Sequence, residues 1–150
     1  MQSTSHSLLS RTDGFAIKSS DTLILIGRIM LAWIFVGSAY GAVTNFAGSI
    51  GYFTSLKVPA SLLFTWLALV TELLLSAGLI LGIGTRYCAI LAFVFVLVAT
   101  ALGHRYWEYP AAQQVGQYIN FLKNISIMGG ALAVVTGGGR FSLDRMLAKQ

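Results

Sequence analysis

The sequence is short of charged residues, cysteine and proline, and each shortage excludes a class of protein. Only 10% of the residues are charged, whereas soluble domains carry about 25%, so this chain has too few charges to cover a water-soluble surface. The single cysteine, Cys88, excludes an intrachain disulfide, a cysteine-pair redox centre and a thiolate metal cage. The two prolines, Pro59 and Pro110, lie in loops, so they leave the long apolar stretches free to form helices.

Histidine is also scarce, which limits the cofactors that the chain can hold. Of His6 and His104, only His104 lies beside an apolar stretch, and a bis-histidine haem needs two histidines on facing helices. We therefore expect no haem, no metal and no covalently attached cofactor. The lysines and arginines are not clustered with aromatic residues as in a phosphate-tracking surface, so a nucleic acid is not expected as a partner either.

What the chain has in abundance is apolar residues, at 56% of the total. A membrane-spanning helix needs about 20 mainly apolar residues, and four stretches meet or approach that length: 22–44, 60–82, 86–104 and 119–137. None shows the alternation of a membrane β-barrel. The sequence thus predicts an all-α, polytopic membrane protein, in which residues 21–139 form one antiparallel four-helix transmembrane bundle.

Two polar tails flank this bundle in the prediction. Residues 1–20 mix charged residues with Ser and Thr and are expected to precede the first helix, which would begin after Ser20 and Asp21. Residues 140–150 form the second tail.

The basic residues predict the orientation of the bundle in the membrane. One side receives the two tails and the link between the second and third spans, with Arg11, Lys18, Arg86, Arg140, Arg145 and Lys149. The other side receives Lys57 and Arg105, with Lys123 just inside the last span. Cytoplasmic loops carry the excess of Lys and Arg, so both termini are predicted to be cytoplasmic.

The two loops on the outer side, 45–59 and 105–118, are long and aromatic. One interpretation is an interfacial belt of anchoring aromatics, and the other is a lid over the outer end of the bundle. Apolar residues at helical spacing predict a short interfacial helix over 50–58 in the first loop.

Two ionisable residues lie well inside predicted spans. Arg28 is about 9 Å from the start of the first span, and Glu72 is about 15 Å from the cytoplasmic end of the second. We expect them to pair, with Thr65 and Ser76 on the same helix face as Glu72. The pair either fixes helix register or forms a functional site, since charges inside the membrane often contact a substrate, proton or counter-ion.

A second polar group is predicted toward the outer side. His104 ends the third span, and Asn120, Lys123 and Asn124 open the fourth. Lys123 is either a snorkelling side chain near a helix end or a ligand-binding residue. Together the four residues predict the entrance of a cavity for a polar headgroup, and a quinone or phenol would suit its histidine, lysine and aromatic neighbours.

The chain resembles the DoxX family of small four-helix bacterial membrane proteins. The motifs that carry the resemblance are Gly27-Arg28, Gly51-Tyr52-Phe53, Val58-Pro59, Glu72-Leu-Leu-Leu-Ser-Ala-Gly78, Gly84-Thr85-Arg86, His104, Asn120-Phe-Leu-Lys-Asn124, Gly129-Gly130 and Gly138-Gly-Arg-Phe-Ser142-Leu143-Asp144. They keep their order over residues 20–145 and exclude the N-terminal tail. The resemblance adds Arg86 to the polar positions of interest and implies a multi-pass protein of the bacterial inner membrane.

The resemblance also implies a link to quinones, because the family takes its name from a subunit of a thiosulfate:quinone oxidoreductase or quinol oxidase. We therefore expect a quinone-linked subunit or accessory of a membrane oxidoreductase or oxidative-stress system, rather than a stand-alone enzyme. Its expected partners are the lipid bilayer and other oxidoreductase subunits. The alternative is a small proton-coupled transporter, which would require a homodimer, or a membrane scaffold for partner proteins.

Overall fold

The computed structural model describes the backbone of residues 3–147 and the side chains of residues 19–147. Within that range the chain is helical and contains no strand. The elements are α1 (Ser3–Thr44), α2 (Phe46–Ser55), α3 (Ser61–Leu81), α4 (Thr85–Gly103), the 3-10 helix η1 (Tyr106–Glu108), α5 (Ala111–Val134) and α6 (Leu143–Leu147). The predicted fold class, a polytopic helical membrane bundle, is confirmed.

Three segments are long and apolar enough to cross a membrane: Ser19–Thr44, Ser61–Leu81 and Thr85–Glu108. Their outward faces carry apolar side chains that a water-soluble protein would bury, such as Trp33, which is 71% exposed. The predicted fourth span falls on α5. With 24 residues α5 is long enough, but the polar residues in its first half lower its hydropathy, and it is not among those three segments.

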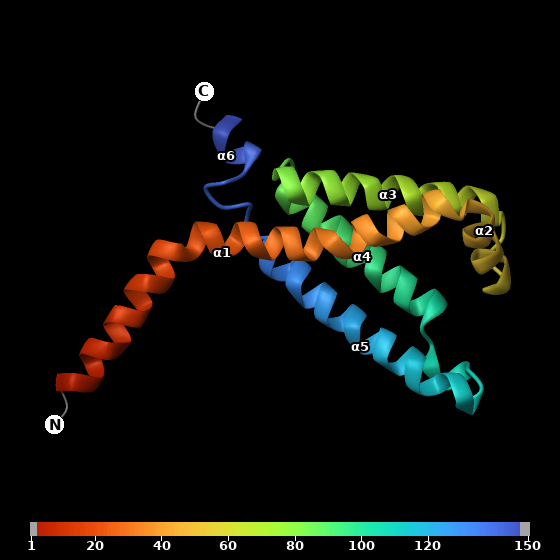
Figure 1. The fold of residues 1–150 in the computed structure, drawn as a ribbon, viewed down its shortest axis with the longest axis horizontal. Helices are drawn as coiled ribbons and strands as arrows, with labels where there is room; N and C mark the ends of the chain where they lie inside the picture. Colours follow the sequence, from red (N-terminus) through yellow and green to blue (C-terminus); the bar gives the residue numbers. More distant parts are fainter. Residues whose placement is uncertain (1–2, 148–150) are drawn as a thin grey trace.

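The long helices pack as two pairs, α1 with α3 and α4 with α5. Figure 1 shows that these pairs lie close together at the end where α3 turns into α4 and diverge toward the end that carries α2. A buried apolar cluster joins them where they are close, with members from all four helices: Leu31, Ala32, Phe35, Leu75, Leu79, Ala92, Val96, Met128 and Ala131. The fully buried alanines let the backbones approach closely, as is typical of helix crossings in membranes.

The N-terminal region differs from the prediction. The sequence predicts a polar tail over residues 1–20, but α1 already begins at Ser3, and Figure 1 shows its N-terminal part bending away from the bundle. Polar residues alone do not end a helix, and residues 3–20 contain no proline. At the other end of the chain, residues 137–144 fold back against the bundle, and the last two of them begin α6. The C-terminal tail over residues 140–150 stays a prediction, and residues 148–150 lie outside the described part.

The short helix predicted over 50–58 is present, but it begins earlier, as α2. Asn45 caps it, since its side-chain oxygen accepts a hydrogen bond of 3.0 Å from the Gly48 amide. Beyond α2, Lys57 and Ala60 have φ values of 58° and 51°, in the left-handed region that non-glycine residues rarely occupy. The Phe46 ring packs on Trp66 of α3 with 4.8 Å between ring centroids, so α2 lies across the end of the bundle.

Candidate ligand-binding cavity

A cavity of about 420 Å³ lies between the two helix pairs where they diverge. Its polar lining residues are Ser38, Asn45, Ser49, Tyr52, Thr65, Glu72, His104 and Asn124. Its larger apolar lining residues are Ile34, Phe35, Phe53, Leu56, Leu69, Phe95, Val96, Leu102 and Ile127. The volume and this mixture of mainly apolar wall and few polar groups are typical of a small-molecule site.

Glu72 lies at the inner end of the cavity, on the wall that α3 provides. Its side chain is 7% exposed, and its Oε1 accepts a hydrogen bond of 2.7 Å from the Ser38 hydroxyl on α1. Ser76 was predicted to support the carboxyl group, but its hydroxyl donates to the backbone carbonyl of Glu72 instead. Thr65 lines the cavity nearer α2 and donates to the Ser61 carbonyl. Glu72 is therefore held by one hydroxyl and faces the cavity.

Arg28 does not pair with Glu72, so the predicted intramembrane pair is wrong. The fully buried Arg28 side chain donates from Nη1 to the Gly138 carbonyl at 2.9 Å and from Nη2 to the Phe141 carbonyl at 2.8 Å. The predicted pair rested on the depths of Arg28 and Glu72 along their helices. Arg28 instead binds carbonyl groups within residues 137–144, which fold back against it. Arg28 thus lies in a sealed contact outside the cavity.

Residues 137–144 form a C-terminal strap across the end of the bundle opposite the cavity. Asp144, on this strap, accepts hydrogen bonds of 2.8 Å from the amides of both Gly84 and Thr85 and so caps α4. A side chain at Gly138 has no room, because its Cβ would lie 2.6 Å from Nη1 of Arg28. The strap therefore closes this end of the bundle with groups that the sequence alone did not assign.

The Asp144 carboxyl group has a lowered pKa. Its partial desolvation acts to raise the pKa, but the hydrogen bonds from the Thr85 and Gly84 amides and the charge of Arg28 outweigh that effect. Asp144 is therefore held as a carboxylate against the α4 N-terminus.

Two of the four residues predicted for the cavity entrance do line it. His104 donates from Nδ1 to Oε1 of Gln117 at 2.7 Å, and Asn124 donates to the Thr100 hydroxyl at 2.8 Å. Asn120 and Lys123 are not among the lining residues. Lys123 is exposed on the outer face of α5, because neighbouring helix positions are rotated by about 100° and Asn124 takes the inward one.

The first of the two long loops, residues 45–59, covers the cavity. Tyr52 and Phe53 on α2 and Leu56 directly after it line the cavity, and the Tyr52 hydroxyl packs against Gly103, where an added Cβ would collide with it. Burial and the neighbouring Tyr109 raise the pKa of Tyr52, so it stays a neutral hydroxyl. Of the aromatic loop residues, those on α2 form the cover, while the second loop (105–118) contributes none of the lining residues and only its neighbour His104 lines the cavity.

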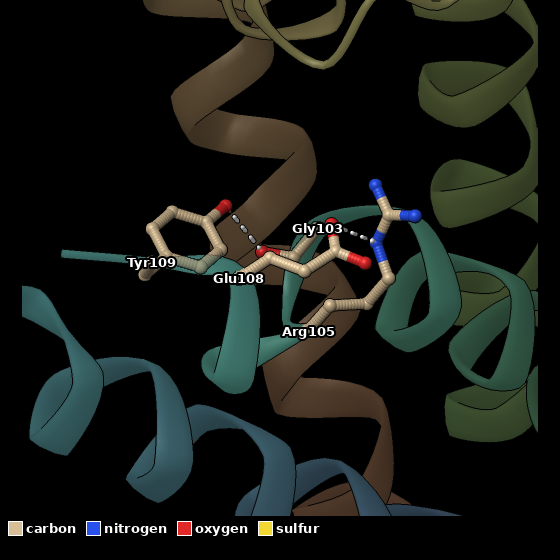
Figure 2. A network of polar contacts seen from close by, with 4 residues as sticks. All are labelled: Gly103, Arg105, Glu108 and Tyr109. Atoms are coloured by element: carbon tan, nitrogen blue, oxygen red, sulfur yellow. Dashed lines mark hydrogen bonds and ion pairs between the residues drawn. The ribbon is translucent and has the colours of Figure 1, made fainter.

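The second loop folds on itself next to the cavity entrance. Figure 2 shows the Tyr109 hydroxyl directed at the Gly103 carbonyl, with a hydrogen bond of 2.9 Å. In the same view Arg105 and Glu108 form an ion pair of 3.2 Å. Gly103 therefore joins the two loops, since the Tyr52 hydroxyl of the first loop packs against it and the Tyr109 hydroxyl of the second donates to its carbonyl group.

Sequence reasoning missed several polar lining residues on the first helix and α2. Ser38, Asn45 and Ser49 recur at spacings of seven and four residues, which in an uninterrupted helix would be one face. These regularly spaced polar residues in an otherwise apolar segment were the sequence pattern that could have indicated a polar cavity wall. Arg86, in contrast, lies at the strap end, where Nη2 donates to the Thr136 carbonyl at 3.3 Å, and takes no part in the cavity.

The fold and the cavity define a small polytopic membrane protein with a partly polar chamber under a helical cover. The DoxX family model matches residues 23–105. Inner membrane protein YphA of Escherichia coli (strain K12) is 36% identical over 124 residues, which cover 82% of this chain and 89% of the relative. Inner membrane protein YqjF of the same strain is 32% identical over 136 residues, which cover 89% of this chain and 98% of the relative. No solved structure matches. The chain belongs to the DoxX family.

Proposed function

We propose that this protein binds the headgroup of a quinone, or of a closely related aromatic carbonyl compound, in the cavity under α2. It would serve as a quinone-linked subunit or accessory of a membrane oxidoreductase or oxidative-stress system. The observation that carries the proposal is the Glu72 carboxyl group at the inner end of a mainly apolar cavity of about 420 Å³. A flat ring with one polar edge matches that arrangement.

Each polar group would have a defined task toward such a ligand. A protonated Glu72 donates a hydrogen bond to a quinone carbonyl, and an ionised Glu72 accepts one from a quinol hydroxyl. The Ser38 hydroxyl fixes one carboxyl oxygen at 2.7 Å and leaves the other for the ligand. Electrons would reside on the ligand and on a partner protein, so the chain itself is not proposed as a stand-alone enzyme.

The two ends of a bound molecule would meet different surroundings. At the inner end the ring would contact the apolar wall and Glu72, while nearer the entrance His104 and Asn124 supply polar contacts. Tyr52 and Phe53 on α2 cover the ring from outside. An amphipathic molecule delivered from the bilayer fits this change from an apolar wall at the inner end to polar side chains near the entrance.

The alternative proposal is proton-coupled transport, for which Glu72 would be the titrating group. Inward of Glu72 the bundle is filled by Leu75 and Leu79, both fully buried, so the cavity gives a binding site more directly than a route across the membrane. A transporter would therefore need a second copy of the chain. A scaffold for partner proteins would need no cavity at all.

The proposed location is the bacterial inner membrane, as for the two relatives named above. The excess of basic residues at the strap end supports an orientation with that end and both termini in the cytoplasm. The cavity would then open toward the outer half of the membrane. A partner oxidoreductase would supply or withdraw the electrons of the bound quinone.

The test is quinone binding by the protein purified in mild detergent. Titration with a short-chain ubiquinol should quench tryptophan fluorescence of the native protein. Glu72→Gln should weaken binding about tenfold, because the carboxylate accepts a charge-assisted hydrogen bond from a quinol hydroxyl and the neutral amide accepts only an uncharged one. Lys123→Gln is the matched control, because that side chain lies outside the cavity, and should bind like the native protein. Equal binding by the Glu72 and Lys123 variants, or no binding by the native protein, contradicts the proposal. Proton-driven uptake that depends on Glu72 in the absence of quinone binding would favour the transporter.

A further inference from the structure

An open groove of about 840 Å³ lies beside the strap, at the end of the bundle opposite the cavity. Three arginines from three different segments border it: Arg86 in the first turn of α4, Arg140 on the strap and Arg145 on α6. Within the described residues, no carboxylate lies within ion-pair distance of any of these guanidinium groups. With Asp21 and Asp144 also in its lining, the groove keeps an excess of one positive charge, and its three guanidinium groups have no carboxylate partner among the described side chains.

The carboxylates that line the same groove are already occupied by other groups. Asp144 uses both oxygens for the Gly84 and Thr85 amides, and its charge acts on the buried Arg28. Oδ1 of Asp21 accepts a hydrogen bond of 2.6 Å from the Arg140 amide. These acids hold the strap in place. Nη2 of Arg86 donates to the Thr136 carbonyl at 3.3 Å, and none of the three guanidinium groups is neutralised by a carboxylate in the described part of the chain, so their charge remains available to an external anion.

The groove lies at the level where the spans end. The span of α1 begins at Ser19, that of α3 ends at Leu81 and that of α4 begins at Thr85, so the groove opens at headgroup depth. Tyr87 on its border is 81% exposed, and Ile83 and Phe141 beside it are 46% and 49% exposed. A ligand here meets guanidinium groups on one side and lipid-facing apolar side chains on the other.

We propose that this groove binds the phosphate headgroup of an anionic membrane lipid. A guanidinium group matches a phosphodiester with two parallel hydrogen bonds, and basic pockets at the ends of transmembrane helices are suited to such headgroups. The exposed apolar residues beside the groove would contact the acyl chains, which a free phosphate ion lacks. The site is separate from the cavity and does not depend on the quinone proposal.

The glycines of the strap place two of the three arginines. Gly137 and Gly139 have φ values of 130° and 70°, and a Cβ at Gly139 would lie 3.2 Å from Oδ1 of Asp21. The strap can therefore run close against α1 only with glycine at these positions. This path carries Arg140 and α6, with Arg145, to the same side as Arg86.

The experiment measures lipid binding by the full chain in nanodiscs of phosphatidylcholine with increasing phosphatidylglycerol, read out by native mass spectrometry. Replacing all three arginines (Arg86→Gln, Arg140→Gln and Arg145→Gln) should weaken phosphatidylglycerol binding at least about tenfold. The matched control is Arg105→Gln, which removes one positive charge at the other end of the bundle and should leave binding unchanged. Equal binding by the triple variant and this control overturns the proposal.

Two further arms distinguish misfolding and free phosphate from lipid binding. The corresponding triple lysine variant keeps the positive charges and should bind phosphatidylglycerol within a few-fold of the native protein. Retained binding by the lysine variant shows that the loss in the glutamine variant comes from the missing charges and not from misfolding. Inorganic phosphate should leave lipid binding unchanged when added at the same concentration as phosphatidylglycerol. If inorganic phosphate displaces the lipid at that concentration, the groove is a site for soluble anions and the proposal fails.

Discussion

The Ser38 hydroxyl on α1 donates a hydrogen bond of 2.7 Å to Oε1 of Glu72 on α3. This contact joins the two helices of one pair at the inner end of the cavity and fixes the carboxyl group on its wall. Arg28 lies on the same helix as Ser38, but it binds the strap at the other end of the bundle. The two buried ionisable residues therefore have separate partners and separate tasks.

Ser38→Ala should lower the unfolding free energy by about 1 kcal/mol, because it removes one partly buried hydrogen bond between helices. It should also weaken quinone binding, since the Glu72 carboxyl group loses its orientation. Thermal unfolding in detergent and the fluorescence titration measure the two effects. The control is Ser126→Ala, whose hydroxyl is exposed and bonds within its own helix to Leu122; the same loss in both variants would contradict a special role for Ser38.

Arg28→Gln should release the strap and leave the cavity intact. The change removes a charged donor of two buried hydrogen bonds, at a cost of about 2–3 kcal/mol. Hydrogen exchange of the strap amides should rise, while quinone binding at Glu72 should stay within about twofold of the native value. Unchanged exchange in the strap together with lost quinone binding would restore the discarded Arg28–Glu72 pair.

Asp144 should make the stability of the protein depend on pH in the acidic range. Its pKa is lowered in the folded protein, so its contribution is complete above the pKa of an unfolded aspartate, about 3.9, and is lost as the pH falls through the lower folded value. Asp144→Asn should remove this acid-side decline and cost about 1 kcal/mol at neutral pH as a weakened helix cap. Melting temperatures between pH 3 and pH 7 provide the measurement.

Glu108→Gln is the control for that series, because Glu108 forms only an exposed ion pair with Arg105. Its pH profile should follow the native protein. A profile of Asp144→Asn that also follows the native protein would show that the carboxylate does not stabilise the α4 N-terminus.

Gly103→Ala should displace α2 from the cavity, because the added Cβ collides with the Tyr52 hydroxyl. Phe46 on α2 packs on Trp66, so the fluorescence of Trp66 in a background lacking the other two tryptophans reports the displacement. Adding Tyr52→Phe removes the colliding oxygen and should restore the native signal. Gly116→Ala is the control, since a Cβ there has open space; if neither alanine variant changes the fluorescence, the contact at Gly103 does not hold the cover.

Asn124→Ala should weaken quinone binding about threefold or more, while Lys123→Ala should leave it unchanged. Asn124 lines the cavity and donates to the Thr100 hydroxyl, and the loss of one neutral hydrogen bond is worth about 1 kcal/mol. The two residues are adjacent in the same helix turn, so both variants place an alanine in the same part of α5. The opposite order of effects would place Lys123 in the binding site.

Hydropathy alone predicted the helical bundle, because long uncharged stretches have few other structures open to them in a membrane. The cavity was only partly predictable. His104 and Asn124 mark it by sequence, but the inward face of α5 depends on how that helix is rotated against α4, which excludes Lys123. Hydropathy also placed the start of the first helix too late, since polar residues can continue a helix beyond the membrane.

The partner of Arg28 was not predictable for a different reason. It consists of backbone carbonyl groups, which every residue possesses and which no sequence pattern distinguishes. The glycines at 137–139 indicated only that a helix ends there. That the chain then folds back under Arg28 follows from tertiary packing, and the same packing brings Asp144 to the amides of Gly84 and Thr85.

The hydrogen bonds from the Gly84 and Thr85 amides to Asp144 also set an order for biogenesis. Asp144 follows Gly84 by 60 residues and Thr85 by 59, so the first turn of α4 and the Arg28 guanidinium group lack their final partners until the strap is translated. Translation of the strap supplies both at once. A nascent chain stopped before residue 138 should therefore remain a substrate for membrane quality control, and the same chain extended past Asp144 should escape it.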